Sequence, residues 1–352
     1  MGLGLQRVTS ASTKVRRLGY FVLFSRILGK DSVPRLVLQQ RIIDERSRNR
    51  ELLEEACREL PVRRAKSEYV TGEICTEDAF KRYIETAINF GLVQELSGRL
   101  YNTKRGEILP ALNASDNPFK LNLSQSYLLL KVISENDYDY TRTVIESSSR
   151  NGPDEHVMFF SNVKELWKQK LAKIKPRNVK EYDDLKKAIG TKWGSAKTYY
   201  LEDIKAPRLE WLLDLNVIEF WNMRKNRVTF RPNPDKLLGN ESNFSNAFVS
   251  YMRPLLNSSA TYWNEVPSLK RNGIMDHLLK QSFTLFKAGS ALRKISVNQL
   301  LEYGVSMLSG SGIICEIGEL DDELERFIRT KSDTYRYVKI ISEADRGYVS
   351  EL

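Results

Sequence analysis

The chain has 352 residues, a formal net charge of +10, and a composition with 41% hydrophobic and 28% charged residues. These values exclude a disordered, collagen-like or disulfide-rich chain and indicate a folded protein of two or three domains. The positive charge favours an anionic partner, whereas three scattered cysteines and two histidines without metal-ligand spacing argue against a metal site and against histidine chemistry.

The first segment, residues 14–110, is expected to begin with two helices. The apolar run Leu18–Leu28 is amphipathic, is interrupted by an arginine and is too short to span a bilayer. We therefore expect a cytoplasmic protein without a membrane segment. Pro34 suits the first position of a second helix, which extends to about Leu60 unless the charged stretch Asp44–Arg50 breaks it.

The clearest helix in the chain follows Thr76, which is a typical N-cap residue. Its apolar residues recur at helical spacing and form one stripe: Phe80, Tyr83, Ile84, Ala87 and Ile88. Gly91 suits the end of this helix, because glycine adopts the left-handed conformation that often follows a last turn.

A short hairpin is expected directly after that helix. Two strands, Leu92–Leu96 and Arg99–Thr103, flank a Ser97–Gly98 turn. The hairpin should end in the basic sequence Lys104–Arg105–Gly106, beside the preceding helix. After a linker at residues 107–123, a second segment begins.

The second segment, residues 119–235, is the most basic part of the chain. Residues 161–231 carry 17 Lys and Arg against 9 Asp and Glu, a net charge of +8. The apolar spacing predicts four helices: Tyr127–Ile133, Tyr140–Ser147, Val157–Leu171 and Val179–Ile189.

The passage from a helix into a hairpin recurs at the end of this segment. Pro207 suits the first position of a helix, and Asn216 then takes the place that Gly91 has in the first segment. The predicted strands are Val217–Trp221 and Arg227–Arg231, and the turn between them is basic.

The third segment, residues 245–352, ends in an acidic region. Residues 315–352 carry 6 Lys and Arg against 10 Asp and Glu. Ser296 and Gln299 predict a capping box, and Gly310–Ile317 predicts a third passage from a helix into a strand. The expected helices are Ala247–Leu255, Ile274–Phe286, Val297–Leu308 and Glu319–Arg329, and the expected strands are Tyr335–Ile341 and Tyr348–Ser350.

The sequence Asn102-Thr103-Lys104-Arg105-Gly106 resembles the wing ending L-T-x-x-G of bacterial winged-helix regulators, and Gly91–Val93 resembles their G-L-V strand start. The resemblance implies a mainly α chain with small β-hairpins, built from three winged-helix-like modules in series. It also implies that the helix before the wing is the helix that faces DNA. The side chains with DNA-facing roles would then be Lys81, Arg82, Arg99, Lys104 and Arg105.

Candidate DNA contacts follow from the basic and polar positions of the two helix–hairpin units, since Lys and Arg neutralise phosphates and position a reading helix. They are Lys81, Arg82, Thr86, Asn89, Arg99, Lys104, Arg105, Lys205, Arg208, Arg224, Lys225 and Arg227. The alternative is that these residues form solvated faces. Glu210 and Asp214 lie beside Trp211 in the second helix and would repel phosphate there.

Sequence patterns of enzymes are weak. Glu165 is followed by Lys168, one residue too far for the Glu-x-Lys spacing of a magnesium-dependent nuclease and on a predicted helix. The acidic residues 316–323 suit helix capping. Gly190–Ser195 lacks the spacing of a phosphate-binding loop. The lysine-rich run 164–197 contains aromatic residues that suit single-stranded nucleic acid, but an exposed helix face explains it better.

We therefore expect a non-catalytic DNA-binding protein, or a DNA-facing subunit of a larger bacterial or archaeal complex, with no cofactor and no metal. Duplex DNA would be bound mostly through its backbone, and the third module would bind a partner protein. Two alternatives remain open: a scaffold whose winged helices bind only proteins, and a dimeric transcriptional regulator.

Overall fold

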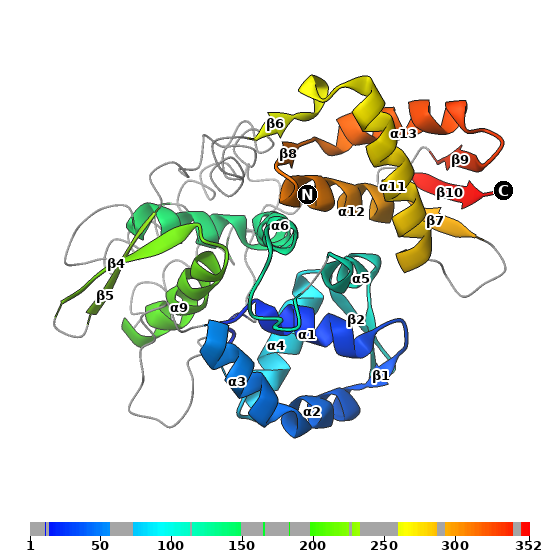
Figure 1. Cartoon of the computed structure of the whole chain (residues 1–352). Helices are drawn as coiled ribbons and strands as arrows, with labels where there is room; N and C mark the ends of the chain where they lie inside the picture. The colour runs from blue at the N-terminus through cyan, green and yellow to red at the C-terminus, as the bar shows by residue number, and fades with distance from the viewer. Residues whose placement is uncertain are drawn as a thin grey trace.

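The computed structural model describes residues 11, 14–56, 73–112, 115–148, 165, 183, 198–224, 227–232, 260–286, 293–340 and 346–352. These residues form a mainly helical structure with small sheets, as the sequence predicts (Figure 1). Among them, no helix combines the length and the apolar composition that crossing a membrane requires. The predicted helices Val157–Leu171, Val179–Ile189 and Ala247–Leu255 lie outside the described residues.

The first segment contains five helices and three short strands in its described part. The helices are α1 (Gly19–Leu28), α2 (Arg35–Asp44), α3 (Arg46–Ala56), α4 (Glu77–Asn89) and α5 (Lys104–Ala111), and the strands are β1 (Val33–Pro34), β2 (Val93–Leu96) and β3 (Arg99–Asn102). The antiparallel sheet has the order β1-β3-β2. The long helix expected after Pro34 is broken at Glu45, within the charged stretch.

The helix–hairpin unit α4–β2–β3 forms where the sequence predicts it. Thr76 caps α4 by accepting a hydrogen bond from the Ala79 N–H at 3.1 Å, and acidic residues follow in the first turn. Gly91 has a φ of 64°, and the Ser97–Gly98 turn has φ values of 51° and 73°. Positive φ at both central residues is the geometry of a tight hairpin turn.

The end of this hairpin differs from the prediction. Lys104–Arg105–Gly106 is the first turn of α5 rather than a wing tip, because Thr103 caps that helix by accepting from the Gly106 N–H at 3.0 Å. Gly106 packs so closely that a Cβ atom there would lie 2.0 Å from the Leu92 carbonyl oxygen. Thr103 and Gly106, the two fixed residues of the wing-like motif, therefore belong to the start of α5. This helix also occupies part of the linker expected at residues 107–123.

The second segment is built on α6 (Leu123–Ser148), α9 (Thr198–Asp214), β4 (Ile218–Arg224) and β5 (Arg227–Pro232). The two helices predicted within residues 127–147 are the two parts of α6, which meet at a kink at Asp137, the one residue of α6 with non-helical φ and ψ. Pro207 lies inside α9 rather than at its start. Asn216 has a φ of 54°, as expected from its correspondence with Gly91, and β4 and β5 then pair antiparallel.

The third segment contains β6 (Thr261–Tyr262), the 3-10 helix η3 (Trp263–Glu265), α11 (Ser268–Phe286), β7 (Lys294–Ser296), α12 (Val297–Gly310), β8 (Ile313–Ile314), α13 (Ile317–Thr330), β9 (Tyr335–Lys339) and β10 (Gly347–Glu351). Its antiparallel sheet has the order β7-β10-β9, which matches the order β1-β3-β2 of the first segment. The short strand after Gly310 pairs in parallel with β6. The hairpin that corresponds to β2–β3 is therefore β9–β10, and it follows α13 rather than α12.

The capping box predicted at Ser296 and Gln299 is absent. Ser296 is the N-cap residue of α12, but its side chain makes no capping hydrogen bond. The Gln299 amide instead donates to the Lys104 carbonyl oxygen at 3.2 Å and to the Glu107 carboxylate at 2.8 Å. The Gln299 side chain, which sequence spacing predicts to cap α12, thus joins the third segment to α5.

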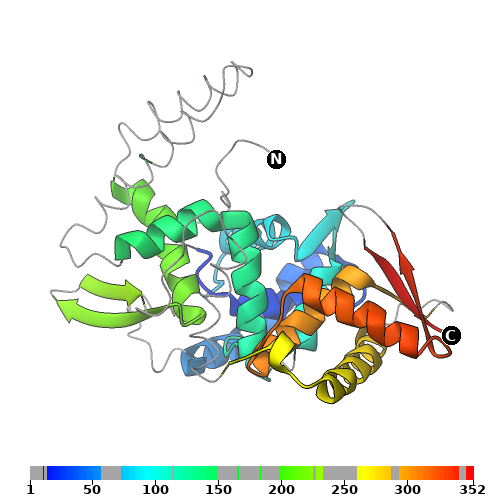
Figure 2. The ribbon, with the colours of Figure 1, turned by 90° about the horizontal axis from the view of Figure 1, so that it is seen from above.

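The three segments share one continuous apolar core. The α12 helix lies between α5 and α6 on one side and α11 and α13 on the other (Figure 1 and Figure 2). The ring of Trp211 in α9 lies 5.5 Å from that of Phe90, and its indole N–H donates to the Val15 carbonyl oxygen at 2.8 Å. Boundaries drawn between the segments in sequence therefore run through packed interfaces.

Candidate nucleic-acid interface

The outer face of α4 contains the first group of predicted DNA contacts. Lys81 and Asn89 are exposed, and Arg82 is partly exposed. Thr86 is fully buried, and its hydroxyl donates to the Arg82 carbonyl oxygen at 2.8 Å. The prediction that Thr86 faces DNA is therefore wrong, because its position in the helix turns the side chain toward the core.

Acidic residues offset the bases on α4. Arg82 lies 3.8 Å from Asp78 and 3.6 Å from Glu85, and Lys14 contacts Asp78 from the N-terminal stretch. The hydrogen bond from Lys14 is the main cause that lowers the pKa of the Asp78 carboxyl, which therefore stays charged near neutral pH. The exposed surface of α4 is mixed in charge and weakly suited to a polyanion.

The β2–β3 hairpin has an uncharged tip. Arg99, next to the turn, is exposed but donates through Nε to the Ser32 hydroxyl at 2.7 Å and through Nη2 to the Ser32 carbonyl oxygen at 2.8 Å. These bonds tie β3 to the loop before β1. Arg99 therefore stabilises the contact between β3 and this loop, while its side chain remains exposed to solvent.

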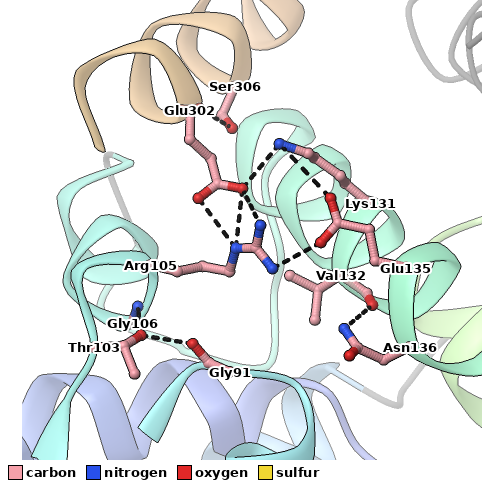
Figure 3. Close-up of polar contacts among 10 residues, drawn as sticks. All are labelled: Gly91, Thr103, Arg105, Gly106, Lys131, Val132, Glu135, Asn136, Glu302 and Ser306. Carbon is pink, nitrogen blue, oxygen red and sulfur yellow. Dashed lines mark hydrogen bonds and ion pairs between the residues drawn. The ribbon is translucent and has the colours of Figure 1, made fainter. Parts of the chain in front are cut away.

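Lys104 and Arg105 differ sharply although they are adjacent. Lys104 is exposed in the first turn of α5. Arg105 points into an ion cluster at the meeting point of α5, α6 and α12 (Figure 3). Its Nε and Nη2 lie 2.8–3.0 Å from the Glu302 carboxylate, and its Nη1 lies 2.7 Å from Glu135.

A second base, Lys131, completes the ion cluster of Arg105, Lys131, Glu135 and Glu302. Its Nζ lies 2.9 Å from Glu302. Desolvation alone would raise the pKa of the Glu302 carboxyl, but Lys131 and Arg105 outweigh it and lower that pKa. The cluster is therefore ionised at neutral pH, and the Arg105 side chain is not available to a phosphate.

The two predicted contacts on α9 are buried. Arg208 is 1% exposed and forms a bidentate pair with the kink residue Asp137, with both N–O distances at 2.6 Å. Lys205 is 2% exposed. The prediction that these residues reach DNA is wrong, because α9 packs between α6 and the first segment and cannot act as an exposed reading helix.

The acids Glu210 and Asp214, which we expected to repel phosphate on α9, contact the N-terminal stretch instead. Asp214 accepts from Arg17 Nη1 at 2.8 Å and from the Leu18 N–H at 3.0 Å, and Glu210 lies 3.2 Å from Arg17. Burial raises the pKa of the Asp214 carboxyl to about 6, although Arg17 opposes the shift. These carboxylates hold the N-terminal stretch to α9.

The β4–β5 hairpin remains as the most basic candidate surface. It lies at the periphery of the described structure in both views (Figure 1 and Figure 2). Arg224 and Arg227 are register partners at its end, on either side of Lys225, which lies outside the described residues. Two of the twelve predicted contacts are thus brought together at one projecting point.

A bulge at Trp221 sets the faces of this hairpin. The register shifts between Phe220 and Asn222, so that Asn222 pairs with Thr229 and Arg224 with Arg227. Alternation along β5 places positions 227, 229 and 231 on one face, and position 231 pairs with Glu219. Arg231 was not predicted as a contact, although its spacing of four from Arg227 in a strand is a sequence signal.

The third segment presents the opposite charge. Its helix before the hairpin, α13, is capped by Glu316 and Glu319, which form the capping box that acidic residues were expected to provide. Asp321 contacts Arg346 at 2.6 Å, and Glu325 contacts Arg329 at 2.7 Å. Acidic residues therefore dominate the helix in the position that α4 has in the first segment.

Other candidate sites receive little support. Within the described residues, no three His, Cys, Asp or Glu side chains come together as metal ligands would. Of the lysine-rich run 164–197, only residues 165 and 183 belong to the described part of the chain. Comparison with known proteins finds no matching family model, no matching curated protein and no matching solved structure.

Proposed function

We propose that the chain is a non-catalytic DNA-binding protein, or the DNA-facing subunit of a larger bacterial or archaeal complex, and that its main contact is the β4–β5 hairpin. The observation that carries the proposal is the pairing of Arg224 with Arg227 at the projecting end of the hairpin, with Arg231 on the same face. Closely spaced arginines that track a backbone supply sequence-independent affinity for duplex DNA.

We further propose that the first and third segments are winged-helix units. In support, the first segment follows the order helix, strand, helices, strand, strand, and the third follows it with the short strand β8 added between α12 and α13; each three-stranded sheet has its first strand beside its last. Thr103 and Gly106 explain the wing-like motif physically, since one caps α5 and the other permits close packing on Leu92. The acidic α13 favours a partner protein for the third unit, as phosphate would be repelled there.

A purely protein-binding scaffold is the second candidate. It is favoured by α9, whose buried position removes the reading helix from the second unit, and by the mixed charge on α4. A dimeric regulator is the third, and its test is the oligomeric state. Metal-dependent DNA cleavage by the purified chain would contradict the non-catalytic assignment.

The test of DNA binding is the salt dependence of affinity for a short duplex, measured by fluorescence anisotropy. The variant R224A/R227A/R231A should lose about 2 to 3 units of the slope of log K against log salt, because each phosphate contact contributes about 0.9. A matched control, K270A/K331A/R336A, removes three exposed charges from the third segment and should leave the slope unchanged.

Equal loss of slope in both triple variants would overturn the hairpin as the specific contact and leave only a net-charge effect. No binding by the unmodified chain at low salt would overturn DNA binding itself and favour the scaffold. Circular dichroism of each variant establishes that the comparison is made between folded proteins.

A further inference from the structure

The two faces of the β4–β5 hairpin differ completely in residue type. In an antiparallel pair, register partners lie on the same face, and successive positions along a strand alternate between the faces. The register of the hairpin therefore assigns each paired position to one face. One face contains only polar residues, at positions Glu219, Asn222, Arg224, Arg227, Thr229 and Arg231. The other face contains only apolar residues, at positions Ile218, Phe220, Met223, Val228, Phe230 and Pro232.

This separation of polar from apolar positions depends on the β-bulge at Trp221. Without an extra residue in β4, strict alternation would place Asn222 and Arg224 on the apolar face, together with Phe220. The register shift between Phe220 and Asn222 instead places both on the face of Arg227. A bulge that completes a wholly polar face is the kind of irregularity that is common beside functional sites.

The helices beside the hairpin indicate which of its faces is open. The strand β4 contacts α9, and β5 contacts α6. An apolar sheet face packs on neighbouring elements, whereas the polar face of an antiparallel sheet lies toward solvent. The hairpin also lies at the periphery of the described structure (Figure 1 and Figure 2). The polar face is therefore the one that a large ligand can approach.

The residue types on the polar face suit both the backbone and the bases of DNA. Its arginines supply positive charge for phosphates, and arginine also pairs with guanine through two hydrogen bonds. Asn222 is the register partner of Thr229 in the middle row of the face, and asparagine pairs with adenine through two hydrogen bonds. The one acid, Glu219, belongs to the row farthest from the turn. Residues that bind phosphate and residues that read bases therefore share one face.

The dimensions of a two-stranded ribbon select one groove of DNA. Its strands lie about 4.8 Å apart, and such a ribbon enters a groove about 12 Å wide but not one about 6 Å wide. These are the widths of the major and minor grooves of B-form DNA. The major groove of A-form RNA is too deep and narrow for side chains to read. From Arg227 to Arg231, β5 spans about 14 Å, which is the length of about four base pairs.

We propose that the β4–β5 hairpin enters the major groove of B-form DNA as a two-stranded ribbon, and that Asn222 determines part of the sequence preference. This inference rests on the DNA binding proposed above and names the groove and the form of nucleic acid. The arginines hold the ribbon to the phosphates, and the middle row of the polar face reaches the base edges. The buried helix α9 has no part in reading DNA. The site covers about four base pairs and discriminates duplex DNA from double-stranded RNA.

Selection from random duplexes tests the role of Asn222. The unmodified chain should enrich a motif of about four base pairs. N222A should bind that motif about 10-fold more weakly, while its affinity for a scrambled duplex changes by less than about twofold. N272A, at an exposed position of α11, is the matched control and should leave both affinities unchanged. The absence of an enriched motif, or equal changes for N222A on the motif and on the scrambled duplex, would overturn Asn222 as a specificity-determining residue.

Competition with groove-binding ligands tests the docking mode. The affinity of the full chain for a duplex that contains an A·T tract is measured in saturating methyl green, which occupies the major groove, or distamycin, which occupies the minor groove. Methyl green should weaken binding by at least about 10-fold, and distamycin by less than about twofold. Double-stranded RNA of the corresponding sequence should bind at least about 10-fold more weakly than the DNA.

The outcomes separate the groove from DNA binding itself. If distamycin inhibits as strongly as methyl green, or if RNA binds as tightly as DNA, the major-groove inference is wrong while the proposed binding of nucleic acid stands. A chain that binds neither duplex at low salt overturns the proposed function, and the groove inference with it.

Discussion

The hairpins β2–β3 and β4–β5 begin in the same way and end differently. Each follows a helix through a residue in the left-handed conformation, Gly91 or Asn216. After β3 the chain turns directly into α5, and Arg105 is held by acids of α6 and α12. In the second hairpin, Arg224 and Arg227 are register partners at the end of β4 and β5, and this hairpin lies at the periphery of the described structure.

The difference shows that a basic residue near a hairpin stabilises the tertiary structure when it forms an ion pair with an acidic residue of another segment. Glu302 is 197 residues from Arg105 in the chain, and Thr103 places Arg105 within its reach by capping α5. No local feature of the sequence around Arg105 contains this information. The two hairpins therefore make separable predictions, one for stability and one for DNA affinity.

The largest expected effect concerns the support of the second hairpin. Arg208→Ala leaves the buried Asp137 carboxylate without its bidentate partner and should lower the free energy of unfolding by about 3 to 5 kcal/mol. Chemical denaturation monitored by circular dichroism measures this loss. A loss below about 1 kcal/mol would mean that α9 is not anchored through this pair. The double variant R208A/D137A, which removes both charges, should recover part of the loss.

The contact between the N-terminal stretch and α9 should depend on pH. The folded-state pKa of Asp214, about 6, is above its usual value of 3.8, so its stabilising contribution is fully present below pH 3.8 and is lost as pH rises to 6. The full shift corresponds to at most about 3 kcal/mol. D214N should flatten this part of the stability profile measured by urea denaturation. An unchanged profile would show that Asp214 titrates normally.

The ion cluster at the first hairpin should behave in the opposite sense. The pKa of Glu302 is below its usual value of 4.5, so its contribution is present above pH 4.5 and is lost as pH falls through the folded-state value. Arg105→Ala should cost about 1 to 3 kcal/mol at neutral pH, less than a fully buried pair because the guanidinium is partly exposed. E302Q should remove the acid-sensitive part of the profile.

Arg105→Ala also sharpens the comparison between the hairpins. Because its side chain is turned into the cluster, the variant should leave the salt slope of DNA binding unchanged while the protein stays folded. If the slope instead falls as far as in R224A/R227A/R231A, the distinction drawn between the two hairpins is wrong.

A smaller loss of stability is expected when Thr103, which caps α5 directly after the first hairpin, is replaced. Thr103→Ala should lower the free energy of unfolding by about 1 to 2 kcal/mol, because the hydroxyl accepts from Gly106 and donates to the Gly91 carbonyl oxygen at 2.6 Å. Thr76→Ala, which removes only the cap of α4, is the matched control and should cost about 1 kcal/mol. Equal losses would mean that the bond to Gly91 adds nothing.

The smallest effect is expected at Lys104, which is exposed beside Arg105. Lys104→Ala should change the free energy of unfolding by less than about 0.5 kcal/mol. If this lysine contacts phosphate, the salt slope should fall by about 1. A large loss of stability would show that Lys104 belongs to the cluster after all.

Sequence patterns were sufficient where the signal is local. The Thr76 cap, the left-handed residues Gly91 and Asn216, and the acidic caps before α13 all lie where spacing and residue type predict them. In each case the residue interacts with backbone only a few positions away, so that the sequence window contains the whole interaction.

Patterns failed where a side chain had two possible partners. Gln299 fits a capping box, yet it bonds to α5, and Arg208 fits an exposed helix face, yet it pairs with Asp137. The candidate site changed accordingly: of the helix residues proposed to reach DNA, Thr86, Lys205 and Arg208 are buried. Helical periodicity separates apolar from polar positions, but it does not indicate which polar position another segment will cover.

By itself, the sequence determined a mainly helical chain whose hairpins follow helices at left-handed residues, because those features depend on neighbouring backbone and on the spacing of apolar side chains. Only the tertiary structure decided that the three segments share one core and that Arg105 is paired inside it while Arg224 and Arg227 stand at a projecting turn. The physical reason is that the interaction of a charged side chain depends on which opposite charges lie near it in space. Only the packing of α5 against α12 brings Arg105 and Glu302 together.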